Sequence, residues 1–170
     1  YKHASGRIIP GIDCYRAVCA HAAAHIMETR VAFKGDDLNP LQVACISLIE
    51  DLRVELNTLK KFPGMKKTWI ALHPEDEDLK DLNPFIVDLV DFSRAALDQK
   101  YTVKQSFNSD FLKLFIKKMT KMPESSAMSY ELGMNYYELL KTETDVKISA
   151  SALVSTPIIY RDDNRYIWEY

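Results

Sequence analysis

Residues 40–61 constrain the fold most, because apolar side chains would cover nearly every side of a helix formed by this stretch. Asn39-Pro40 predicts the start of that helix, with the Asn39 side chain as N-cap and the proline in the first turn. One apolar stripe follows helical spacing and consists of Leu41, Cys45, Leu48, Leu52, Leu56 and Leu59. The opposite side also carries apolar residues, at Val43, Ile46 and Val54. Other helices must surround such a helix, so the sequence predicts a helical bundle with this helix at its centre.

Four more helices are predicted from apolar periodicity and from helix start and stop signals. They cover about residues 13–32, 83–99, 108–122 and 126–142. Asp13 would cap the first of them, and a turn-rich connection anchored by Trp69 would precede the second. Residues 147–170 are β-prone and aromatic, which predicts an extended tail. We therefore expect an all-α, multi-helix bundle in residues 1–146, followed by an extended C-terminal linker in residues 147–170.

Charge and composition argue against several classes of function. The formal net charge is −2, without an excess of lysine and arginine, so no nucleic-acid partner is expected. No apolar run reaches the roughly 18 residues that a membrane span needs. The three cysteines form no CxxC pair and lie among apolar neighbours, which indicates buried thiols and a cytoplasmic location. The chain begins without methionine, so we expect it to be a segment of a longer protein.

A pair of histidines is the first candidate site. His21 and His25 lie four residues apart in the sequence HAAAH, so a helix would place both imidazoles on one side. This spacing is typical of a zinc-binding helix. The acids of the next helix would supply a third ligand, and we predict Glu50. In HExxH metalloproteases the residue after the first histidine is the general base, but here it is Ala22. Three interpretations remain open, namely hydrogen-bonded histidines in a packing face, a structural zinc site and a hydrolase.

The acids of residues 50–55 form the second candidate site. Asp51 and Glu55 lie one turn apart on the flank of the apolar stripe, whereas Glu50 faces the other side. Carboxylates on a central helix need partners, and Arg53 can bind the carboxylate of Glu50 through two parallel donors. We therefore predict a partly buried network of Asp51, Arg53 and Glu55 that fixes the helix register, with Trp69 as an apolar anchor. A ligand or metal role for the acids is the alternative.

Four segments, in this order, resemble a known group of proteins. They are YRAVCAHAAAH at 15–25, PLQVACISLIEDLRVE at 40–55, PGMKKTWIALHP at 63–74 and LVDFSRAALD at 89–98. The chain resembles the von Willebrand A-containing partners of MoxR-type AAA+ ATPases. That group includes nitric-oxide-reductase activation proteins of the NorD type and Rubisco-activase subunits of the CbbO type. The tail YRDDNRYIWEY at 160–170 is similar to the stretch that leads into the von Willebrand A domain of this group.

The resemblance implies a function without catalysis. In this group the helical region would be an adaptor that docks on the hexameric MoxR-type ATPase, while the A domain would hold a client enzyme. The segment at 63–74 is more similar to the Rubisco-activase branch, so Rubisco is the first expected client and nitric oxide reductase, a metalloenzyme, is the next. The alternatives are a zinc-binding, degenerate metallohydrolase-like domain and a helical scaffold without an ATPase partner.

Overall fold

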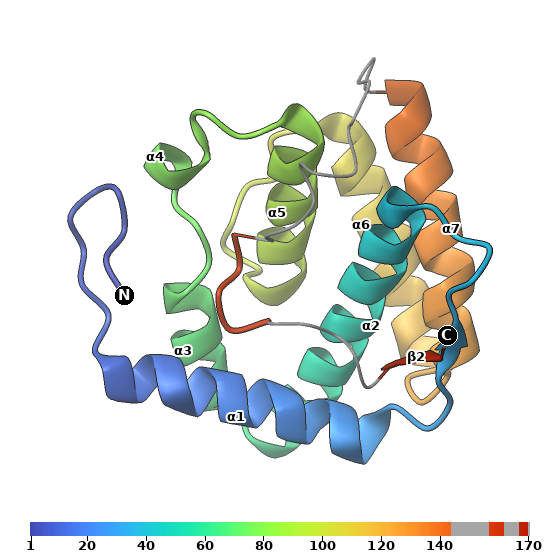
Figure 1. Ribbon diagram of the computed structural model, residues 1–170, viewed down its shortest axis with the longest axis horizontal. Coiled ribbons are helices and arrows are strands. Elements are labelled where there is room, and N and C mark those ends of the chain that lie inside the picture. Colours follow the sequence, from blue (N-terminus) through green and yellow to red (C-terminus); the bar gives the residue numbers. More distant parts are fainter. Residues whose placement is uncertain (144–156, 162–166, 170) are drawn as a thin grey trace.

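The computed structural model describes residues 1–143, 157–161 and 167–169 (Figure 1). Within them lie seven helices and one pair of short strands, which confirms the all-α bundle. The helices are α1 Gly11–Glu28, α2 Pro40–Lys61, α3 Met65–Ala71, α4 Asp76–Leu79, α5 Pro84–Leu97, α6 Ser106–Lys121 and α7 Ser126–Glu143. The strands are β1 Phe33–Lys34 and β2 Trp168–Glu169. None of these helices is both long and apolar enough to cross a membrane.

Helix α2 lies at the centre, as its apolar pattern predicts, and contacts α1, α5 and α7. Its start is capped in the predicted way, because Asn39 Oδ1 accepts the backbone N–H groups of Leu41 and Gln42, each at 3.0 Å. The side-chain oxygen of Gln42 accepts the Asn39 N–H at 2.8 Å, which completes a capping box. Helix α7 packs directly against α2, and the closest approach is at Gly133, beside the backbone of Ile46.

The main apolar core lies between α2, α5, α6 and α7. Its centre is an aromatic group in which the rings of Phe92, Phe111 and Tyr136 lie 4.7–5.4 Å apart. The Tyr136 hydroxyl donates to Asn108 Oδ1 at 2.7 Å, so this buried polar group is satisfied. A second apolar core joins α1, α3 and α5 and includes Trp69 and Tyr160, both fully buried.

Two local predictions for the first half of the chain are wrong. Helix α1 begins two residues before Asp13, with Pro10 at the N-cap and no side-chain cap bond. Asp13 instead lies in the first turn, where its carboxylate is 3.3 Å from Arg16. Trp69 lies within α3, in a stretch predicted as turns, because an amphipathic helix of only seven residues gives a weak periodic signal.

The tail is the larger difference from the predicted fold. Residues 157–161 and 167–169 pack into the helical domain, with Tyr160 and Ile167 fully buried, so these residues are not a separate linker. Strand β2 lies beside β1 near the C-terminal end of the chain (Figure 1) and pairs with it in parallel. In this register Trp168 lies opposite Phe33. The apolar and aromatic side chains of these residues complete two of the cores, which explains their β-prone pattern. The remaining positions of the predicted linker lie outside the described residues.

Candidate functional site

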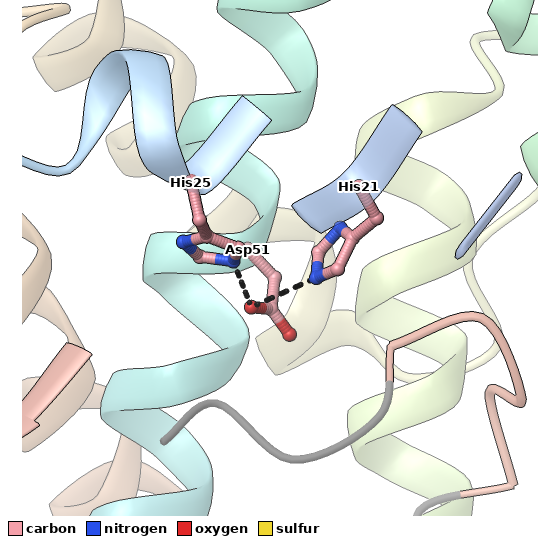
Figure 2. Close-up of side chains that lie close together, drawn as sticks. All are labelled: His21, His25 and Asp51. Atoms are coloured by element: carbon pink, nitrogen blue, oxygen red, sulfur yellow. Dashed lines mark hydrogen bonds and ion pairs between the residues drawn. The ribbon is translucent and has the colours of Figure 1, made fainter. Parts of the chain in front are cut away.

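Two histidines on α1 and one aspartate on α2 meet inside the bundle (Figure 2). Nε2 of His25 is 3.0 Å from Oδ1 of Asp51, and Nε2 of His21 is 3.6 Å from the same oxygen. All three residues are at most 5 % exposed. Their ligand atoms lie within 4.8 Å of one another, a separation that would let them hold one metal ion. Helix α1 produces this convergence because the spacing of four residues puts both rings over one turn of α2.

The predicted third ligand, Glu50, is not part of this cluster. Its carboxylate binds Arg53 on the same helix, with Nε at 2.7 Å from Oε2 and Nη2 at 2.6 Å from Oε1. Burial raises the pKa of Glu50, but the bonds and charge of Arg53 outweigh it and hold the pKa below its ordinary value. The predicted pairing of Glu50 with Arg53 is therefore confirmed, and Asp51 lies in the place beside the histidines that was predicted for Glu50.

Arg53 also ties three separate segments together. It donates to the backbone carbonyl of Glu28 at the end of α1, at 2.8 Å, and to that of Pro123 before α7, at 3.0 Å. Both acceptors are carbonyls at a helix end or in a connection, so no N–H group of a helix donates to them. This arginine is fully buried, and its bonds to Glu28 and Pro123 fix α2 relative to the neighbouring segments.

A chain of hydrogen bonds links Glu50 to the histidine cluster. Thr29, directly after α1, donates its hydroxyl hydrogen to Oε1 of Glu50 at 2.7 Å. The same hydroxyl lies 3.0 Å from Nδ1 of His25. Since its one hydrogen already goes to the carboxylate, the hydroxyl can only accept from His25. Nδ1 of His25 must therefore carry a hydrogen.

Glu55 forms the second ion pair of the site, with a partner from the tail. Arg161 donates Nε to Oε1 at 2.7 Å and Nη2 to Oε2 at 2.5 Å, and Glu55 is fully buried. Burial raises the pKa of Glu55, but Arg161 and His21 reverse this and lower the pKa to about 2. Burial lowers the pKa of Arg161, but the charge of Glu55 and its hydrogen bonds outweigh this and raise the pKa far above its ordinary range. Both groups are therefore charged at neutral pH.

The third nitrogen of Arg161 joins a further buried histidine. Nη1 donates to the Ser93 hydroxyl at 2.8 Å, and that hydroxyl donates to Nε2 of His73 at 3.0 Å. Nδ1 of His73 donates to the Trp69 carbonyl at 2.9 Å. Burial and the charge of Arg161 lower the pKa of His73 to about 4, so this histidine is neutral and all of its polar atoms are satisfied.

His21 is the exception among these polar groups. Nδ1 lies 3.0 Å from Oε1 of Glu55, an ion-pair distance, and Nε2 faces Asp51. The contact with Asp51 is too long for a hydrogen bond, and both ring nitrogens are without a regular one although the side chain is 4 % exposed. Buried polar atoms without partners are rare in folded proteins and often mark an absent ion or water.

Sequence patterns did not predict three residues of the site, namely Arg161, His73 and Ser93. All three lie in segments singled out for their resemblance, at 160–170, 63–74 and 89–98, but no spacing relates them to α2. Charge counting gives the one available signal. Two carboxylates, Asp51 and Glu55, face the histidines with no basic residue on their side of α2, so a cation from elsewhere in the chain was required.

A separate cavity of about 600 Å³ lies beside α5 and is lined by Asp88, among others. Burial, and then the charge of Asp91, raises the pKa of Asp88 from 3.8 to about 6. An acid with a raised pKa in the folded state stabilises the fold below its unfolded pKa, and loses this contribution as the pH rises through the folded value.

Asp88→Asn, which imitates the protonated acid, is therefore expected to stabilise the protein at pH 7 and not at pH 4. Each pKa unit corresponds to roughly 1.4 kcal/mol, and solvent in the cavity reduces the effect, so we expect about 1–2 kcal/mol. Urea unfolding of both proteins between pH 4 and pH 8 measures this difference. A constant difference across that range would contradict the raised pKa.

No protein-family profile, curated protein or solved structure matches the chain.

Proposed function

We propose that this chain is a non-catalytic adaptor domain that docks on a MoxR-type AAA+ ATPase hexamer and helps it to remodel a client enzyme. Rubisco is the preferred client, and nitric oxide reductase is the next. The ordered segments at 15–25, 40–55, 63–74 and 89–98 support this assignment by their resemblance to such adaptors. The outer face of α1 is the observation that carries the proposal.

Helix α1 has two apolar faces, and only one of them is covered. Its inner face carries the buried Ala17, Ala24 and the two histidines. The outer face exposes Ile12 by 55 %, Tyr15 by 67 % and Ile26 by 77 %. A helix of a domain without partners normally places charged residues there, and large exposed apolar patches mark interaction sites. Figure 1 shows α1 along one edge of the molecule, where another protein can approach it.

The geometry of these four segments favours a scaffold over an active site. The acids of IEDLRVE bind Arg53 and Arg161, and Trp69 Nε1 donates to the Ala17 carbonyl of α1 at 3.2 Å. The Trp69 bond holds α1 against α3, and the bond from Arg53 to the Glu28 carbonyl holds α1 against α2. We therefore assign the segments the task of presenting the outer face of α1 in a fixed orientation.

Substitutions on that face test the docking proposal. Ile26→Asp and Tyr15→Asp are expected to weaken binding to a purified MoxR-type AAA+ ATPase at least tenfold, because a charge would be buried in an apolar contact. The fold should be unchanged, since both side chains are mostly exposed. Binding is measured with purified proteins by biolayer interferometry, together with stimulation of ATP hydrolysis.

Ile116→Asp on α6 is the matched control, because this isoleucine is also exposed, by 44 %, but lies on a different helix. It should bind as the unmodified protein does. Equal binding of all three variants, or no binding by the unmodified protein, would remove the docking proposal.

Zinc binding is a second candidate function, which the cluster of His21, His25 and Asp51 favours. Two imidazoles and one carboxylate form a donor set that zinc accepts. We propose a structural role for the ion, between α1 and α2. The methyl group at Ala22 cannot deprotonate water, so a hydrolase of the HExxH type has no general base at that position.

A further inference from the structure

We infer that His21, His25 and Asp51 bind one divalent transition-metal ion through two Nε2 atoms and Oδ1, and that Thr29 and Glu50 orient His25 for it. This inference rests on zinc binding, the second candidate function, and adds the ligand atoms and the positioning residues. It is independent of docking on an ATPase. Figure 2 shows the three side chains converging between α1 and α2.

The hydrogen-bond chain determines which nitrogen of His25 is free. Glu50 can only accept, so the Thr29 hydroxyl donates to it and accepts from Nδ1 of His25. In a neutral imidazole the other nitrogen then carries a lone pair. In that state Nε2 of His25 points its lone pair at Oδ1 of Asp51, only 3.0 Å away. Two acceptors at this distance require a cation between them.

A proton on Nε2 of His25 would satisfy that one contact, but it leaves His21 unexplained. Nε2 of His21 faces the same oxygen at 3.6 Å and has no regular hydrogen bond in this buried site. A proton is shared by one donor and one acceptor, whereas a metal ion accepts lone pairs from both imidazoles and the carboxylate together. The convergence of two buried imidazole nitrogens on one carboxylate oxygen thus favours a metal.

The distances agree with this interpretation. Zinc–nitrogen and zinc–oxygen bonds of ~2.0–2.1 Å at tetrahedral angles place neighbouring ligand atoms roughly 3.3 Å apart. The two nitrogen–oxygen separations, 3.0 Å and 3.6 Å, lie on either side of that value. Entry of an ion would therefore change these two separations by only a few tenths of an ångström.

The surroundings are those of a metal site. A ligating histidine commonly donates its other nitrogen to a hydroxyl, carbonyl or carboxylate, and such partners contribute about 10–100-fold to metal affinity. Thr29 and Glu50 provide this partner for His25. Glu55 lies 3.0 Å from Nδ1 of His21 and is positioned to do the same for that ring. Arg161 holds Glu55 in place through both carboxylate oxygens.

The test uses the whole chain, freed of metal by a chelator and titrated with Zn²⁺, and in parallel with Co²⁺ as a spectroscopic probe. We expect one equivalent of each ion, and visible absorption bands of tetrahedral Co²⁺. Asp51→Asn should weaken zinc binding at least a hundredfold. Thr29→Val should weaken it about 10–100-fold, while Thr29→Ser, which keeps the hydroxyl, should restore it. His3→Gln is the matched control, because His3 is also a buried histidine paired with an aspartate, Asp78. The His3→Gln protein should bind zinc as the unmodified protein does.

Histidine NMR of the unmodified protein makes the result independent of how well the variants fold. Zinc should shift the ring signals of His21 and His25 and leave those of His3 and His73 in place. Absence of a stoichiometric ion, or unchanged signals of His21 and His25, would overturn both the zinc function and this inference. Tight binding that is lost in Asp51→Asn but unaffected in Thr29→Val would keep zinc binding and overturn the positioning role of Thr29.

Discussion

Arg161→Met is expected to lower the free energy of unfolding by about 3–5 kcal/mol, the usual effect of removing one partner of a buried ion pair. The substitution leaves the carboxylate of Glu55 fully buried beside a second carboxylate, Asp51, and removes the guanidinium that binds both of its oxygens, so that only the His21 imidazole faces it at 3.0 Å. It also removes the hydrogen bond from Nη1 of Arg161 to the Ser93 hydroxyl, and the same hydroxyl bonds to His73. Methionine has a similar length, so the loss of packing is small. Urea unfolding followed by circular dichroism measures the change.

Two controls separate the ion pair from other effects. Arg30 lies 3.3 Å from Glu124, with both side chains more than two-thirds exposed, so Arg30→Met should change the stability by less than about 1 kcal/mol. The double variant with Glu55→Gln and Arg161→Met should recover part of the loss, because the uncompensated charge is gone. Equal effects of Arg161→Met and Arg30→Met would show that the buried pair contributes nothing specific.

Gly133→Ala is expected to destabilise the protein by about 3 kcal/mol, at the upper end of the range for overpacked cores. A Cβ atom at this position would lie 2.5 Å from Cα and 2.8 Å from N of Ile46, and real Cβ contacts are essentially never shorter than 3.0 Å. These atoms belong to the backbone of α2, so no side-chain rotation relieves the contact. Helices α2 and α7 would have to separate along the main core.

Gly11→Ala is the matched control for this substitution. Gly11 is also a helical residue, the first of α1, but nothing lies within 4 Å of an added Cβ. Alanine has a higher helix propensity than glycine, so Gly11→Ala should leave the stability unchanged or raise it by up to about 1 kcal/mol. Thermal unfolding of the two variants provides the comparison. A Gly133→Ala protein as stable as Gly11→Ala would mean that α2 and α7 are not in such close contact.

The helices that carry strong local signals were predictable from the sequence. Asn39-Pro40 and Asn83-Pro84 start α2 and α5, because proline in the first turn and an asparagine cap act within a few residues. Helices α3 and α4 were missed, since seven and four residues give too short a pattern. The position of α1 was predicted, but its first residue was not, because no side chain caps it.

The candidate site was predictable only where one helix contains both partners. The pair of Glu50 and Arg53 is local, and the spacing of His21 and His25 fixes their common face. The choice of Asp51 as third ligand depends on how α1 packs across α2, which no periodicity specifies. Arg161 is 106 residues away from Glu55, so their contact exists only in the folded molecule.

That separation has a consequence for synthesis on the ribosome. Residues 21 to 55 emerge first and can form α1 and α2. The carboxylates of Asp51 and Glu55 lack the charge of Arg161 until that residue leaves the exit tunnel. At 5–20 residues per second, the delay is on the order of 5–20 seconds. During that time the nascent chain holds two acids and two imidazoles in an incompletely closed interior. A metal ion present in the cell at that moment would meet an accessible set of ligands, which the arriving tail then encloses.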